Sequence, residues 1–132
     1  MRTGLPKRAG QAVVVVDDDP AVLGALKFAL ELEEFSVAAY RSGSELLAEA
    51  RLPDFGCLVI DFKLPDMDGL SLLAALRDRA VRLPAVLITS NPSASLRRRA
   101  EEVAAPIVEK PLLGNALLDA IRLALGEGTS AT

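Results

Sequence analysis

A chain of 132 residues that is 51% hydrophobic and 25% charged is long enough for one globular domain and is not a disordered segment. Its formal net charge of -3 gives no general attraction for nucleic acid, and the absence of histidine excludes imidazole catalysis, histidine metal sites and a phosphohistidine. The apolar run Ala12–Val16 is far too short for a signal peptide or a membrane span, and a single cysteine suits a reducing compartment. We therefore expect a cytoplasmic protein.

Short apolar, β-branched runs alternate with helical patterns along the chain. Strands are predicted, in chain order, at Ala12–Val16, Phe35–Tyr40, Phe55–Ile60, Ala85–Ile88 and Ile107–Glu109. Helices are predicted from Pro20 onward, from Ser42 to about Arg51, from Gly69 to about Arg79, around Arg97–Arg99, and over Leu113–Leu125. This alternation predicts an α/β fold with a doubly wound parallel sheet, covered by helices on both faces. Residues 12–125 form the predicted domain, and 1–11 and 126–132 are predicted flexible tails.

Local signals define two helix starts and part of the core. Asp19 is a predicted N-cap with Pro20 as the first helical residue, and Ser42 with Glu45 forms a capping box. The residues predicted to pack in the core are Phe28, Phe35, Phe55 and the leucines at helical spacing. Cys57 lies in an apolar run and is predicted to be an inert, buried thiol.

Polar side chains stand at the ends of four predicted strands: Asp17 and Asp18, then Asp61, Thr89 and Lys110. In an open α/β sheet, sites form beyond the carboxyl ends of the strands, so these residues should converge. Clustered carboxylates repel unless a cation compensates them, and Mg²⁺ prefers oxygen ligands. We expect Mg²⁺, with Mn²⁺ as an alternative, bound directly by Asp18 and Asp61 and through water by Asp17.

Asp61 in such a site could act as a carboxylate nucleophile toward a phosphoryl donor. Positive charge from the metal and Lys110 would stabilise the transferred group, and Thr89 would donate its hydroxyl to a phosphoryl oxygen. The simpler alternatives are that Asp17–Asp19 is a solvated turn that caps a helix and that Thr89 is an ordinary strand-end residue. The coincidence of Asp61 and Lys110 at the same predicted edge disfavours both alternatives.

Four segments resemble the receiver domains of bacterial response regulators. They are Val16–Pro20, Ile60–Gly69, Thr89–Ser90 and Glu109–Pro111, and the similarity extends over about Gln11–Leu125. The resemblance implies a flavodoxin-like fold of five βα units with strand order 2-1-3-4-5. It implies that Asp61 is the phosphoacceptor, that Asp17 and Asp18 are the acidic pair, and that the backbone carbonyl of Lys63 completes the magnesium sphere.

The resemblance also implies roles for the residues after the fourth and fifth strands. Thr89 would be the switch hydroxyl that moves toward the phosphoryl group, Lys110 would bridge to that group, and the Lys110–Pro111 bond would be cis. Small Ser90 would leave the site open to a donor. Asn91 near the entrance, like Lys63, would modulate the phosphoryl lifetime, although a solvated Lys63 without a kinetic role is an equal alternative.

The chain departs from the family pattern before Lys110. The position that often holds an inward-turning Tyr or Phe is Ile107, whose aliphatic side chain can still change rotamer. Pro106 stiffens the entry to the last strand, so the output face is expected to be unusual. The Arg97–Arg99 run predicts a solvated helix face, with a dimer or partner interface as the alternative.

The resemblance implies a sensor histidine kinase or a histidine phosphotransfer protein as donor, and an output partner that the sequence does not identify. Phosphorylation would shift the face formed by the fourth helix, fifth strand and fifth helix. We expect a signalling phosphoacceptor, not an enzyme, with limited self-phosphorylation from small donors and autodephosphorylation. We expect no nucleic-acid or membrane binding by this chain, and a homodimer stays open.

Two other functions remain as alternatives. A magnesium-dependent aspartyl-phosphate phosphohydrolase would carry a second acid two residues after the nucleophile, where this chain has Lys63. The chain could instead be the receiver portion of a larger DNA-binding transcriptional regulator. Nothing after Leu125 resembles a helix-turn-helix, so we do not expect the chain as given to bind DNA by that route. The tail Gly126–Thr132 could be a natural terminus or the start of a linker, and we favour a stand-alone receiver.

Overall fold

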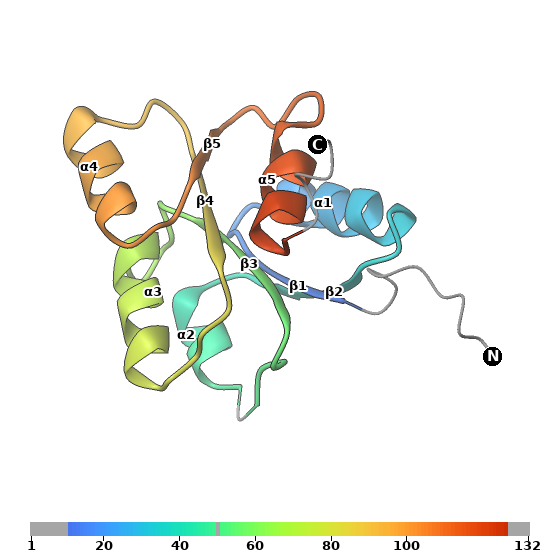
Figure 1. Ribbon diagram of the computed structural model, residues 1–132, viewed down its shortest axis with the longest axis horizontal. Helices are drawn as coiled ribbons and strands as arrows, with labels where there is room; N and C mark the ends of the chain where they lie inside the picture. The colour runs from blue at the N-terminus through green and yellow to red at the C-terminus, as the bar shows by residue number, and fades with distance from the viewer. Residues whose placement is uncertain (1–10, 50, 127–132) are drawn as a thin grey trace.

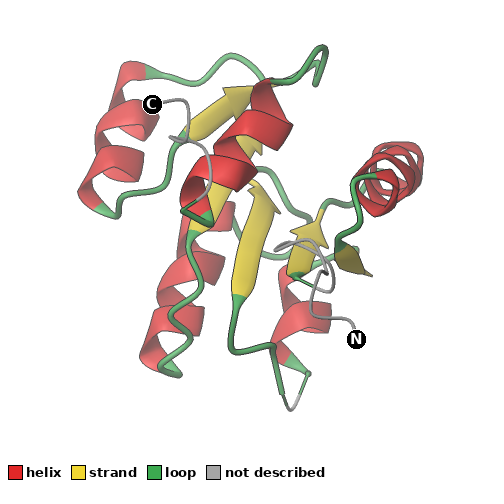
Figure 2. Ribbon diagram, turned by 45° about the vertical axis from the view of Figure 1, so that its right-hand side comes forward, coloured by secondary structure: helices red, strands yellow, loops and turns green. Residues whose placement is uncertain are grey.

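The fold is a parallel sheet between two helical layers (Figures 1 and 2). The computed structural model describes residues 11–49 and 51–126. The five strands run in the order β2-β1-β3-β4-β5. The strands are β1 (Ala12–Val16), β2 (Ser36–Tyr40), β3 (Gly56–Asp61), β4 (Ala85–Thr89) and β5 (Ile107–Glu109). The helices are α1 (Pro20–Leu32), α2 (Gly43–Leu47), α3 (Gly69–Asp78), α4 (Ala94–Glu102) and α5 (Ala116–Ala124). The predicted α/β class, flavodoxin-like arrangement and strand order are confirmed.

The core is divided by the sheet into two apolar layers. Successive side chains of a strand point to opposite faces, so Val13 and Val15 pack with α1 and α5, whereas Val14 and Val16 pack with α2, α3 and α4. Figure 1 shows α1 and α5 together on one side and the other three helices on the opposite side. Because β1 is apolar throughout, it can be buried on both faces, as the centre of a doubly wound sheet requires.

The strand register brings the polar strand ends together. Val16 of β1 pairs with Ile60 of β3, so the residues that follow β1 stand beside Asp61, the last residue of β3. Asp61 in turn pairs with Ile88, next to Thr89 at the end of β4. Thr89 pairs with Glu109, which directly precedes Lys110. The predicted convergence of strand ends is therefore built into the register.

The predicted helix caps are present. The side chain of Asp19 accepts hydrogen bonds from Ala21 N at 2.9 Å and Val22 N at 3.5 Å, with Pro20 as the first helical residue. The hydroxyl of Ser42 accepts from Glu45 N at 3.1 Å at the start of α2. The Glu45 carboxylate reaches back to the N–H of Arg41 at 2.7 Å, one residue before the cap.

Two helices are shorter than predicted. The prediction that α2 continues to about Arg51 is wrong, because the helix ends at Leu47, whose carbonyl oxygen accepts a hydrogen bond from Arg79 Nη1 at 2.6 Å. The prediction that the last helix begins at Leu113 is also wrong. Gly114 has a positive φ of 67°, which breaks the helical turn, and α5 begins at Ala116.

Two of the three phenylalanines predicted for the core are exposed. Phe35 is 4% exposed, but Phe28 is 67% and Phe55 82% exposed. Phe28 lies on the side of α1 opposite Leu26 and Leu30, the buried leucines two residues before and after it. Phe55 lies directly before β3 begins. Cys57 is fully buried, as predicted.

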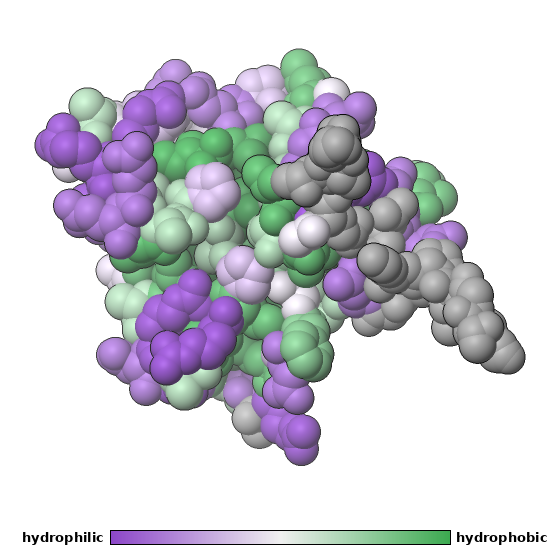
Figure 3. Space-filling view, in the orientation of Figure 1, coloured by the Kyte–Doolittle hydropathy of each residue, from purple (hydrophilic) through white to green (hydrophobic). Residues whose placement is uncertain are grey.

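The surface of α4 is strongly polar. Its three consecutive arginines, Arg97–Arg99, are exposed, and only Leu96 and Ala100 of this helix are buried. In Figure 3 the region of α4 is accordingly hydrophilic. None of the helices in the described ranges is both long and apolar enough to cross a bilayer. The predicted tails, residues 1–11 and 126–132, lie outside the described residues except for Gln11 and Gly126.

Candidate functional site

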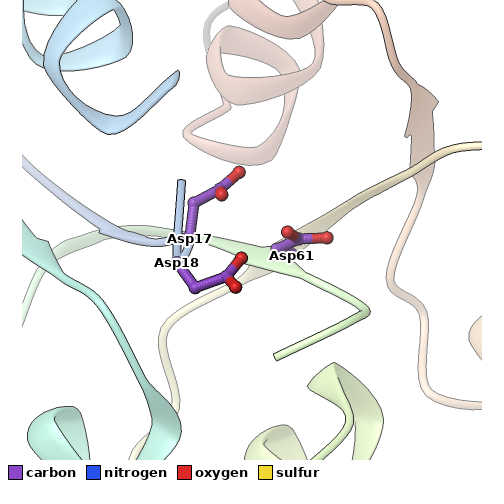
Figure 4. A group of neighbouring side chains, drawn as sticks. All are labelled: Asp17, Asp18 and Asp61. Atoms are coloured by element: carbon purple, nitrogen blue, oxygen red, sulfur yellow. The ribbon is translucent and has the colours of Figure 1, made fainter. Parts of the chain in front are cut away.

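Three carboxylates gather at the ends of β1 and β3. Asp17, Asp18 and Asp61 each offer an oxygen that lies within 4.8 Å of the other two (Figure 4). Asp17 is fully buried, Asp61 is 4% exposed, and Asp18 is open to solvent. The structure therefore brings together all three predicted metal ligands that act through their side chains.

Lys110 is the positive charge of this cluster. Its Nζ lies 3.0 Å from Asp61 Oδ2, to which it donates a hydrogen bond, and 3.0 Å from Asp17 Oδ2. The lysine reaches the site because Lys110 N donates to Thr89 O at 2.8 Å, which continues the β4–β5 pairing past the end of β5. A single ammonium thus faces two buried carboxylates.

The two partners of this ion pair respond differently to burial. Burial raises the pKa of Asp61, and the charge of Asp17 adds to this rise, while the hydrogen bond from Lys110 opposes it. Burial lowers the pKa of Lys110, but its close contacts with the Asp17 and Asp61 carboxylates outweigh this effect and leave the pKa above its ordinary value. Lys110 therefore stays charged, whereas Asp61 stands in surroundings that disfavour a lone negative charge.

The loop between β3 and α3 closes against Asp61. The N–H of Lys63 donates to Asp61 Oδ1 at 3.2 Å, and Lys63 forms an antiparallel bridge with Asp68. Gly69 N donates to Phe62 O at 2.7 Å. A Cβ on Gly69 would lie 2.7 Å from the carbonyl oxygen of Asp61, so only glycine allows the loop to return this close to the strand.

Thr89 and the two residues after it form the rim of the site on the β4 side. Thr89 is 2% exposed, and its Oγ1 makes only a long contact of 3.5 Å with Ser90 O. Ser90 and Asn91 are exposed, and Asn91 has a left-handed φ of 44°. Because this acceptor is weak, the buried Thr89 hydroxyl can donate a stronger hydrogen bond to another acceptor.

Ile107 lies away from the carboxylates. It pairs with Leu87 and is half-buried against the apolar layer that contains Leu96 and Ala100 of α4. Because side chains alternate along a strand, Thr89 faces the same side of the sheet as Leu87, and hence the same side as Ile107.

Two neighbours of Lys110 complete this edge of the site. The Lys110–Pro111 bond is cis, as expected, and Pro111 is exposed. Glu109 forms an exposed ion pair with Arg97 of α4, with 2.7 Å between Oε2 and Nη2. This ion pair joins the solvent-exposed arginine run to β5, the strand that directly precedes Lys110.

One polar residue of this region has contacts that the sequence did not predict. Asp66 accepts hydrogen bonds from the N–H groups of Gly43 and Ser44 at the start of α2. The hydrogen bond from the Ser44 hydroxyl, together with these backbone bonds, holds the pKa of the Asp66 carboxyl below its ordinary value. The contact spans 22 residues in sequence, so no local pattern indicates it.

Comparison with known proteins identifies the family of the chain. Residues 13–122 match the family described as response regulator receiver domain. The chain is a response regulator receiver domain. The resemblance of its four motifs is thereby confirmed, and a receiver domain is a signalling phosphoacceptor in two-component systems rather than a classical enzyme.

Relatives of this receiver domain include transcriptional regulators. FixJ of Azorhizobium caulinodans is 35% identical over 116 residues, which cover 86% of this chain and 54% of FixJ. DctD of Pseudomonas aeruginosa is 35% identical over 122 residues, which cover 91% of this chain and 26% of DctD. The crystal structure of FixJ-N, 32% identical, superposes with a TM-score of 0.79 over 88% of this chain and 94% of that one. The receiver domain thus spans about half or less of these two regulators.

The donor set of the receiver domain suits a divalent cation. Three carboxylates converge, and Asp17 Oδ2, although close to Lys110, is a buried oxygen without a hydrogen bond. Subtracting the one ammonium from the three carboxylates leaves two negative charges unbalanced. Hard oxygen ligands and an excess of two charges fit Mg²⁺, and Mn²⁺ as its substitute.

Proposed function

We propose that Asp61 accepts a phosphoryl group from a sensor histidine kinase or a histidine phosphotransfer protein in the cytoplasm. The observation that carries the proposal is the position of Lys110 Nζ, 3.0 Å from both Asp61 and Asp17, beside three converging carboxylates. Asp17, Asp18 and Asp61 would hold Mg²⁺, with the backbone carbonyl of Lys63 as a further ligand. The bound ion would supply positive charge next to the transferred group.

The residues of the chain then have distinct roles in the transfer. A carboxylate oxygen of Asp61 forms the bond to phosphorus while the phosphorus–nitrogen bond of the donor histidine breaks, and the electron pair of that bond stays on the donor imidazole. Lys110, already beside Asp61, stabilises the charge on the phosphoryl oxygens. Small Ser90 leaves the entrance open, and Asn91 and Lys63 set how readily water reaches the acyl phosphate.

The signal would leave the site through Thr89. Its buried hydroxyl has only a 3.5 Å contact with Ser90 O, so a phosphoryl oxygen is a better acceptor. Movement of Thr89 would affect the side of the sheet where Ile107 packs against α4. The equilibrium between the conformations of the α4–β5–α5 surface would then shift. An aliphatic rotamer change at Ile107 replaces the aromatic relay, and Pro111 and Pro106 hold the ends of β5.

Incubation with Mg²⁺ and acetyl phosphate tests phosphoryl acceptance. Intact-protein mass spectrometry is expected to find one added phosphoryl group in the wild type and none in Asp61→Asn. Ser71→Ala, at an exposed serine on α3, is the matched control and should be modified like the wild type. Loss of the adduct without Mg²⁺ is also expected. An adduct that persists in Asp61→Asn, or rapid multiple turnover of unrelated phosphoesters, would overturn the proposal.

A second candidate concerns the output. The two regulators described above are longer than this chain, and their names describe them as transcriptional regulatory proteins. The receiver could therefore control a DNA-binding segment encoded after residue 132, instead of acting alone on a separate output partner. Reading the gene beyond the codon for Thr132 separates these alternatives. A stop codon at that point supports the stand-alone receiver.

A further inference from the structure

The tip of the β3–α3 loop is fastened to the first turn of α2. Asp66 Oδ1 accepts from Gly43 N at 3.2 Å, and Oδ2 accepts from Ser44 N at 2.7 Å and also from Ser44 Oγ. Met67 packs over Gly43, where a Cβ would lie 2.7 Å from the methionine sulfur. Hydrogen bonds and packing thus hold the same point of the loop.

The base of this loop is closed as tightly as its tip. Gly69 N donates to Phe62 O at 2.7 Å, and Lys63 bridges to Asp68, which caps α3 by accepting from Ser71 N at 2.7 Å. Between base and tip only Leu64 and Pro65 remain. Because only two residues separate Asp66 from Lys63, a displacement of Asp66 is expected to move Lys63 as well.

The contact with Asp66 is not needed to begin α2. That helix already has its own N-cap, because Ser42 Oγ accepts from Glu45 N at 3.1 Å. A five-residue helix also gains little from a carboxylate at its end, since its dipole is small. The Asp66 contact therefore acts mainly by fixing the position of the β3–α3 loop.

We propose that Asp66, with Ser44 as its partner, is a positioning residue for the metal site and sets the affinity of the receiver for Mg²⁺. It does so by holding the loop so that the Lys63 backbone carbonyl is ready as a ligand before the ion arrives. A ligand that is preorganised in this way loses less conformational freedom on binding. The inference rests on the proposed function, in which that carbonyl is a metal ligand.

Isothermal titration of the full chain with Mg²⁺ tests the proposal. Asp66→Ala is expected to raise the Kd about fivefold, the lower end of ordinary coupling between sites. Ser44→Ala, which removes the hydroxyl and keeps the N–H donor, is expected to raise the Kd less. Ser42→Ala is the matched control, because it removes the cap of the same helix without touching the loop, and its Kd should equal that of the wild type.

Amide hydrogen exchange provides a readout that does not depend on phosphoryl transfer. Coupling between two sites is reciprocal, so Mg²⁺ should slow exchange at Gly43 and Ser44, whose N–H groups bind Asp66. The N–H of Glu45 binds Ser42 instead and should slow less. Equal slowing at all three amides would mean that Mg²⁺ stabilises α2 as a whole, which contradicts the proposal.

The outcomes separate this inference from the proposed function. If the wild type does not bind Mg²⁺, the metal site itself is wrong. If the wild type binds and Asp66→Ala has the same Kd, the metal site stands and the positioning role is wrong. A Kd raised equally in Ser42→Ala also overturns positioning, because helix stability would then explain the effect. Should Asp66→Ala fail to fold by circular dichroism, Asp66→Asn and Ser44→Ala decide by the same criteria.

Discussion

Lys110 Nζ donates a hydrogen bond of 3.0 Å to Asp61 Oδ2, although 49 residues separate the two in sequence. The same ammonium lies 3.0 Å from Asp17 Oδ2, so the ends of β1, β3 and β5 are joined electrostatically at one point. Without Lys110, Asp17 and Asp61 would face each other as buried like charges. The lysine is therefore part of the fold's stability as well as of the proposed chemistry.

Replacing Lys110 by methionine should destabilise the fold in metal-free buffer. Removing one partner leaves buried carboxylates uncompensated, and because the lysine side chain is 22% exposed we expect about 2 kcal/mol, below the cost for a fully buried pair. Urea denaturation measures the change. The control is Lys27→Met, which breaks the exposed Lys27–Glu31 pair of α1 and should cost at most about 0.5 kcal/mol. Equal costs for both variants would contradict the structural role of Lys110.

Magnesium should stabilise the wild type against thermal unfolding. A ligand that binds only the folded state at a hundred times its Kd adds about 2.7 kcal/mol to the free energy of unfolding. Asp61→Asn removes one ligand and one negative charge, so it should gain much less from Mg²⁺. Differential scanning calorimetry with and without Mg²⁺ measures both gains. An equal rise in Tm for the two proteins would show that the ion binds elsewhere.

The fold was predictable because its signals are local and repeated. Five apolar runs separated by helical patterns are enough to predict a parallel sheet. The caps at Asp19 and Ser42 are contacts between residues close together in the sequence. The wrong predictions concern features that depend on residues distant in the sequence. Arg79 donates a hydrogen bond to the carbonyl oxygen of Leu47, the last residue of α2, and Phe28 is 67% exposed on α1 although it is apolar.

The candidate site was predictable for a different reason. In a parallel sheet the carboxyl ends of all strands lie at one edge, so Asp61, Asp17 and Lys110 could be grouped without any distances. The Asp66–Ser44 contact could not be found in this way. It depends on how a loop folds back over a helix start, and no periodic pattern encodes that geometry.

Cys57 should react with thiol reagents only when the protein opens. The side chain is fully buried in β3, and burial raises the pKa of the Cys57 thiol to about 12. Compared with the ordinary value of 9.0, the thiolate fraction at neutral pH falls about a thousandfold, before steric protection is counted. A chromogenic disulfide reagent should therefore label the chain slowly in buffer and rapidly in denaturant. Fast stoichiometric labelling of the folded protein would contradict this burial.

Thr89→Ala should separate phosphoryl acceptance from the response. The variant keeps Asp61 and Lys110, so acetyl phosphate and Mg²⁺ should still modify it. The hydroxyl that turns toward the phosphoryl group is gone, so the amide chemical-shift changes that a beryllofluoride mimic causes at Ile107 and Lys110 should be strongly reduced. Thr89→Ser restores a hydroxyl at the same buried position and should restore most of these changes. If Thr89→Ala responds like the wild type, the signal passes from Asp61 to β5 through Lys110 and not through the threonine.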